Sequence, residues 1–171
     1  MSRLRVGRIF YLFVSVTALI LDRLSKWQVQ RRIELHDSIS VIPGFFRLTH
    51  LENPGAAFGI FSDTPTPLKL GVLIALSAIA LIVVTVLLWK SSNALSSTSV
   101  GLALILGGAI GNLWDRILHH RVTDFLLFYY HQYEWPAFNL ADSAIVVGAA
   151  LLVLDLVFSK TPQEELAKGS A

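Results

Sequence analysis

The stretch GGAIGNLWDRILHHRVTDFLLFYYHQYEWPAFNLAD, residues 107–142, sets the organisation of this chain. Asp124 lies just beyond an apolar segment rich in small residues, and Asp142 lies where the next apolar segment begins. If both apolar segments cross a membrane, the two carboxylates lie at the same membrane edge. Carboxylates close to hydrocarbon are energetically costly and usually have a function.

Two neighbouring carboxylates can share one proton, because burial and mutual repulsion separate their pKa values. Such a pair supplies one acid and one base at neutral pH, which is what the activation of water against an amide requires. We therefore expect Asp124 and Asp142 to be the catalytic pair of an aspartic protease set in a membrane. Asp142 also has a structural alternative, because Asn139 and Asp142 match the N-cap and N3 acid of a helix.

Composition excludes several other classes of protein. The chain has 171 residues, of which 54% are hydrophobic and 15% charged, and its mean hydropathy is +0.61, unlike an ordinary soluble domain. A net charge of +2 with scattered basic residues argues against nucleic-acid binding. The chain has no cysteines, and the adjacent His119 and His120 point apart, so we expect no metal site and no cofactor.

The apolar segments predict an all-α membrane protein, a four-transmembrane-helix bundle with a small β-rich extramembrane insertion. We expect spans over about residues 8–27, 68–89, 100–118 and 140–158, each close to the length that a bilayer requires. A cleavable signal peptide would also begin with basic residues and an apolar run, but no small-x-small site follows that run. One domain covers residues 1–160, and the polar tail 161–171 is expected to be disordered.

The insertion over residues 28–67 has short β-rich runs broken by Pro43-Gly44, which predicts a small bent sheet. The N-terminal arginines place both termini in the cytoplasm, so the insertion and the aspartates should lie near the outer face. In the third span, the spacing of Gly107 and Gly111 predicts a face for close helix contact.

Further polar residues gather at the same edge. Asn112, Asp115 and Arg116 share one face of the third span, which predicts a polar support below the aspartates; the alternative is an Asp115–Arg116 pair at the rim. Asp22 and Lys26 have i,i+4 spacing. An exposed pair would contribute only about 0.2–0.5 kcal/mol, and the alternative is that they orient polar groups near the catalytic edge.

Asp155 is a further carboxylate in the fourth span. It lies roughly 20 Å beyond Asp142 along a helix, at 1.5 Å per residue, and therefore near the opposite surface. We expect it to be too far away to join the site.

Five motifs, in order along nearly the whole chain, resemble the motif set of bacterial lipoprotein signal peptidases. They are Leu21-Asp22-x-x-Ser25-Lys26, Asn53-x-Gly55-Ala56-Ala57-Phe58, Gly107-Gly108-Ala109-x-Gly111-Asn112-x-x-Asp115-Arg116, Val122-x-Asp124-Phe125 and Phe138-Asn139-x-Ala141-Asp142. The chain departs from the family pattern where His120 and Arg121 replace a usual glycine, and where Ser25 replaces a common threonine. If position 120 needs a positive φ, histidine tolerates it at some cost.

The resemblance implies an aspartic endopeptidase that removes the signal peptide from a diacylglyceryl-modified prolipoprotein, cutting before the lipidated cysteine. It implies a bacterial cytoplasmic (inner) membrane location, contact with membrane lipid and inhibition by globomycin-type compounds; we also expect a monomer. Asp124 and Asp142 match the catalytic positions. The positions that match support or substrate-binding residues are Asp22, Lys26, Asn53, Gly55, Asn112, Asp115, Arg116, Asn139 and Ala141.

Two other classes of membrane protein are alternatives. A small transporter or proton channel would also place Asp and Arg in a bundle, but it predicts polar residues through both leaflets, whereas here they gather at one edge. A purely structural membrane protein gives no reason for the clustered Asn, Asp and Arg.

Overall fold

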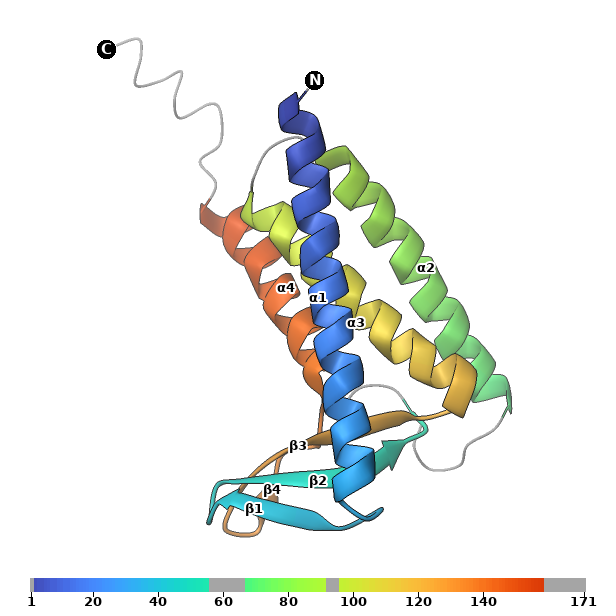
Figure 1. Ribbon diagram of the computed structural model, residues 1–171, viewed down its shortest axis with the longest axis vertical. Helices are drawn as coiled ribbons and strands as arrows, with labels where there is room; N and C mark the ends of the chain where they lie inside the picture. Colours follow the sequence, from blue (N-terminus) through green and yellow to red (C-terminus); the bar gives the residue numbers. More distant parts are fainter. Residues whose placement is uncertain (1, 56–66, 92–95, 159–171) are drawn as a thin grey trace.

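The computed structural model describes residues 2–55, 67–91 and 96–158. The described helices lie side by side as a bundle, and an antiparallel sheet lies across one end of it (Figure 1). The helices are α1 (Ser2–Arg32), α2 (Pro67–Ser91), α3 (Ser97–His119) and α4 (Leu140–Phe158). The strands are β1 (Ser38–Ile42), β2 (Phe46–Asn53), β3 (Val122–Tyr130) and β4 (Tyr133–Glu134).

Three helices among the described residues, α2, α3 and α4, are long and apolar enough to cross a membrane. They contain the spans predicted over residues 68–89, 100–118 and 140–158. The chain is thus a helical, membrane-type protein with a small antiparallel sheet. Helix α1 is not among the three, so the first span, over residues 8–27, stays a prediction. The tail predicted over residues 161–171 lies outside the described residues.

Helix α3 packs against each of the other helices, and glycines allow the close approach. A Cβ at Gly107 would lie 2.4 Å from the carbonyl oxygen of Ser15 in α1, and one at Gly111 would lie 2.6 Å from Asp22 Oδ2. A Cβ at Gly108 would lie 2.4 Å from the carbonyl oxygen of Ala141 in α4. The predicted contact face at Gly107 and Gly111 is confirmed, and it joins α3 to α1.

The insertion predicted over residues 28–67 is β-rich over only part of its length. Residues 28–32, QVQRR, continue α1, because Gln and Arg are good helix formers. Residues 56–66 lie outside the described part. The strands of the expected small sheet are present as β1 and β2, which pair antiparallel, and Gly44 in the turn between them has a φ of 78°. The sheet order β1-β2-β3-β4 shows that the insertion supplies only half of the sheet.

Asp124, just beyond α3, belongs to the strand β3 and lies opposite Leu51 of β2. Residues 122–130, VTDFLLFYY, are rich in β-branched and aromatic residues, which favour a strand once a partner strand is available. His120 is the C-cap that follows α3, and its φ of 60° turns the chain into β3. The positive φ considered for position 120 is thus confirmed.

A small apolar core joins the sheet to the end of α1. Val29 of α1, Ile33 directly after α1 and Phe125 of β3 are buried together, and Leu48, Leu126 and Leu140 pack around them. Beside this core, Gln30 Nε2 donates a hydrogen bond to Thr123 Oγ1 at 2.8 Å. These contacts hold β3 against the bundle on both sides of Asp124.

Candidate active site

Asp124 accepts amide hydrogen bonds on both carboxylate oxygens. Asn53 Nδ2 donates to Oδ2 at 2.9 Å, and Asn139 Nδ2 donates to Oδ1 at 2.7 Å. The sheet register explains the first bond, because Asn53 pairs with Val122 and is therefore a diagonal neighbour of Asp124. Burial raises the pKa of Asp124 to about 6; the charge of Asp142 also raises it, while the two amides and Lys26 act in the opposite direction.

Asp142 lies in the first turn of α4 and also accepts two hydrogen bonds. Asn112 Nδ2 donates to its Oδ1 at 2.7 Å, and the Asn139 backbone N–H donates to its Oδ2 at 3.2 Å. The Asp142 N–H in turn donates to Asn139 Oδ1 at 2.9 Å. These last two bonds form a capping box, so the helix-capping alternative for Asp142 describes a contact that is present.

The strand β3 brings the two aspartates together. The Phe138 carbonyl oxygen accepts from the Phe125 and Leu126 backbone N–H groups, and the Phe138 N–H donates to Leu126 O. This bridge places the residue that follows, Asn139, beside Asp124. The start of α4 therefore meets the sheet at the catalytic candidates.

Both carboxylates line one pocket of about 490 Å³. Its polar lining consists of Asn53, Asn112, Arg116, Asp124, Asp142 and Ser143. The rest of the wall is mostly apolar and includes Val122, Trp135, Phe138, Ile145, Val146 and Val147. Apolar walls with a few converging polar groups are typical of a site that binds a partly apolar ligand. The pocket gives Asp142 a position that capping alone does not require.

Arg116 holds the turn that carries Asn53 against α3. Its Nη2 donates to the Gly55 carbonyl oxygen at 3.1 Å, and its Nη1 donates to the Asn112 carbonyl oxygen at 3.3 Å. The Gly55 N–H donates to Asn53 Oδ1 at 2.9 Å, which leaves the Asn53 amide N–H groups to face Asp124. The turn thus orients one of the two donors to Asp124.

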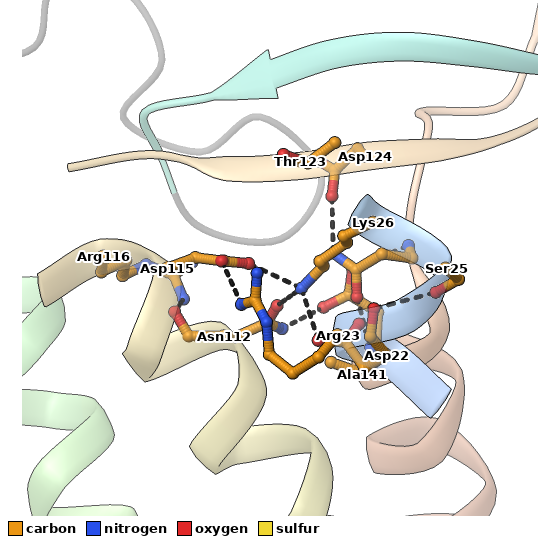
Figure 2. Close-up of polar contacts among 12 residues, drawn as sticks. Asp22, Arg23, Ser25, Lys26, Asn112, Asp115, Arg116, Thr123, Asp124 and Ala141 are labelled. Carbon is orange, nitrogen blue, oxygen red and sulfur yellow. Dashed lines mark hydrogen bonds and ion pairs between the residues drawn. The ribbon is translucent and has the colours of Figure 1, made fainter. Parts of the chain in front are cut away.

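A buried ion cluster lies between α1 and α3. The side chains of Asp22 and Lys26 are fully buried. Lys26 Nζ lies 2.8 Å from Asp22 Oδ2 and 2.8 Å from Asp115 Oδ2, and it donates to Asn112 Oδ1 at 3.1 Å. Arg23 pairs with the other oxygen of Asp115. Figure 2 shows Lys26 between Asp22 and the end of α3 that carries Asn112 and Asp115.

The cluster decides the alternatives left open for these residues. The alternative that Asp22 and Lys26 form an exposed pair is wrong, because both side chains are buried and Asp22 Oδ1 accepts the Ala141 N–H at 3.0 Å. The rim pair of Asp115 with Arg116 is also wrong, because Asp115 faces α1 and pairs with Arg23 and Lys26 instead. Arg23 was not among the residues singled out from the sequence, although a basic residue within a predicted membrane span is a recognisable signal.

The structure brings all the predicted site residues to one end of the bundle. Around Asp124 and Asp142 lie Asp22, Lys26, Asn53, Gly55, Asn112, Asp115, Arg116, Asn139 and Ala141. Asp155 lies apart from them, where it accepts hydrogen bonds from Ser97 Oγ at 2.7 Å and from Thr98 Oγ1 at the start of α3.

A model of the family described as signal peptidase (SPase) II matches residues 14–158. The chain belongs to the signal peptidase II family. A lipoprotein signal peptidase of Solibacter usitatus is 46% identical over 147 residues, covering 85% of this chain and 90% of that protein. One of Neisseria meningitidis is 42% identical over 155 residues, covering 91% and 93%.

A solved structure described as "Bacterial membrane enzyme structure by the in meso method at 2.3 A resolution" has a TM-score of 0.78 with this chain. The two are 30% identical, and the match covers 90% of this chain and 92% of the other. Membership of the signal peptidase II family indicates a protease. In this signal peptidase II family member, the two aspartates in the pocket are the candidate reacting groups.

Proposed function

We propose that this chain is an aspartic endopeptidase that removes signal peptides from diacylglyceryl-modified prolipoproteins, cutting before the lipidated cysteine. The observation that carries the proposal is that Asp124 and Asp142 line one pocket and are linked through Asn139. The relatives named lipoprotein signal peptidase support the substrate class.

The chemistry uses one ionised and one protonated carboxyl group. The ionised aspartate takes a proton from water, which attacks the scissile carbonyl carbon while the protonated aspartate polarises the carbonyl oxygen. The protons then redistribute as the tetrahedral intermediate collapses, and no covalent bond to the protein forms. The raised pKa of Asp124, about 6, suits a group that holds the shared proton.

The apolar wall of the pocket suits the lipid and the signal peptide. Ile145, Val146 and Val147 line it from α4, a helix apolar enough to cross a membrane. Acyl chains can contribute about 0.8 kcal/mol for each buried CH₂, so an unmodified precursor should be cut poorly. The protein acts as a monomer in the bacterial cytoplasmic membrane, with cytoplasmic termini and the pocket near the outer face.

One cleavage assay tests the proposal. Purified full-length protein is mixed with a lipidated prolipoprotein, and the precursor should shift to a smaller size on a gel. A globomycin-type compound should block the shift, and an unlipidated precursor should react slowly. Folded protein that produces no shift would overturn the proposal, whereas equal rates on both precursors would remove only the lipid requirement.

A further inference from the structure

We infer that Lys26 is a positioning residue for this reaction, and that it acts through Asn112 by fixing the amide that donates to Asp142. The inference rests on the proposed function, since it assumes that Asp142 is one of the reacting groups. Lys26 itself is not one of the residues that line the pocket.

Three asparagines hold the two carboxylates, and in each of them a donor occupies Oδ1. The Gly55 N–H occupies that of Asn53, and the Asp142 N–H occupies that of Asn139. Each amide therefore presents Nδ2 to a carboxylate. Each of these two donors is a backbone N–H in the same turn as its asparagine, so the local fold of that turn provides the donor.

Asn112 differs from the other two asparagines, because its Oδ1 accepts from a side chain on another helix. Lys26 Nζ of α1 lies 3.1 Å from Asn112 Oδ1, and Asn112 Nδ2 lies 2.7 Å from Asp142 Oδ1. An ammonium group has donors and no acceptor. A flipped amide would place its NH₂ against the ammonium and its oxygen against the carboxylate, so both contacts would become repulsive.

The surroundings of Lys26 prevent it from leaving Asn112. Its ammonium lies 2.8 Å from Asp22 Oδ2 and 2.8 Å from Asp115 Oδ2, and its side chain is fully buried. The two carboxylates thus hold the ammonium at the Asn112 oxygen. The chain of contacts from Lys26 through Asn112 to Asp142 has one orientation.

A merely structural role for Lys26 would be to pair charges between α1 and α3, and Arg23 offers a matched control for that role. Arg23 lies on the same helix and pairs with the same residue, Asp115, but through Oδ1, whereas Lys26 pairs through Oδ2. A loss of helix pairing alone should lower the stability of both variants and leave the kcat of the folded protein unchanged in both.

The test is a double-mutant cycle on full-length protein in detergent, with kcat and KM measured on a lipidated precursor. Lys26→Met should lower kcat roughly tenfold, the effect of one hydrogen bond, and leave KM nearly unchanged. Arg23→Met should keep kcat within about twofold of the unmutated protein. Asn112→Ala should lower kcat, and Lys26→Met added to it should lower kcat little further.

The inference would be overturned if Lys26→Met lowered kcat by the same factor with and without Asn112→Ala. It would also be overturned if Lys26→Met and Arg23→Met lowered kcat equally. If Lys26→Met fails to fold because a buried carboxylate has lost its partner, the cycle is run with Asp22→Asn added throughout, which removes one negative charge. The same non-additivity is expected there. An unmutated protein that leaves the lipidated precursor uncut would overturn the proposed function and this inference together.

Discussion

Asn139 connects the two aspartates through a single side chain. Its Nδ2 donates to Asp124 Oδ1 at 2.7 Å, and its Oδ1 accepts the Asp142 N–H at 2.9 Å. The charge of Asp142 also raises the pKa of Asp124, so the state of one carboxyl group affects the other. At the scale of residues, we therefore treat the pair as one functional unit.

If the pair acts as one unit, losing either carboxylate removes the shared-proton chemistry. Asp124→Asn, Asp142→Asn and the double variant should be about equally inactive, each losing roughly a hundredfold to ten-thousandfold in kcat. The assay is cleavage of a lipidated precursor by folded protein. Asp155→Asn is the control, because this carboxylate binds Ser97 at the other end of the bundle and should keep activity.

A role of Asp142 in helix capping alone predicts a different result. Asparagine is itself polar, so Asp142→Asn would then cost about 1 kcal/mol of stability and little activity. Substantial turnover by either single variant would contradict the catalytic assignment.

The pKa of Asp124 leads to a prediction of the pH profile. Burial raises this pKa to about 6, so the free protein loses the shared proton as the pH rises through that value. Because kcat/KM reports the free enzyme, it should decline above about pH 6. Substrate in the pocket excludes water and further disfavours the charged form, so the decline in kcat should come at a higher pH.

Both profiles can be measured with the lipidated precursor from acidic to alkaline pH. A steady rise of kcat/KM across that range would show that Asp124 is needed in its ionised form. Identical alkaline limbs in kcat and kcat/KM would show that bound substrate does not desolvate the pair.

At the scale of elements, the approach of α3 to α4 sets the distance between Asn112 and Asp142. Gly108 of α3 lies against the Ala141 carbonyl, one residue before Asp142. Four residues after Gly108, one turn along α3, lies Asn112. The close approach of the two helices therefore positions a donor and its carboxylate together.

Gly108→Ala tests this packing. The added Cβ would lie 2.4 Å from the Ala141 carbonyl oxygen, so the helices must move apart. We expect the free energy of unfolding to fall by about 1–3 kcal/mol and activity to fall with it. Gly71→Ala in α2 is the matched control, because its Cβ would meet nothing within 4 Å. The control should keep activity and gain up to about 1 kcal/mol of helix stability.

Thermal unfolding in detergent and cleavage activity provide the two measurements. Gly108→Ala protein as stable and as active as the unmutated protein would contradict the view that this contact sets the site geometry.

At the scale of the whole molecule, the sheet and the aspartates lie at one end of the bundle, and the N-terminus of α1 lies at the other (Figure 1). The two ends differ in chemistry. The end with the sheet carries the ion cluster and the catalytic candidates, while the other end carries Asp155 with Ser97. An asymmetric molecule of this kind should have one fixed orientation in the membrane.

Cysteine labelling tests that orientation. Cysteines replacing Ser38 of β1 and Gln132, between β3 and β4, should react with an impermeant reagent added outside the cell, because these positions are exposed at the sheet end. A cysteine replacing Lys90, exposed at the end of α2, should react only after the membrane is permeabilised. The chain has no native cysteine, so the background is low. Labelling of position 90 alone would invert the predicted topology.

Local properties of the chain were sufficient for much of this description. Apolar length located α2, α3 and α4 to within a few residues, because the hydropathy of a segment does not depend on its neighbours in space. The glycine spacing in α3 predicted a contact face, and the departure at His120 led us to consider a positive φ that the structure has. The motif resemblance named the residues that the fold then brings together.

Partners distant in the sequence were decided only by the tertiary structure. Asp124 lies on a strand because β2, some seventy residues earlier, pairs with β3, and no local pattern identifies that pairing. Asp115 binds Arg23 and Lys26 rather than the adjacent Arg116, because the packing of α1 on α3 buries its carboxylate against α1. Spacing along one helix shows which residues share a face, whereas the helix packed against that face determines their partners.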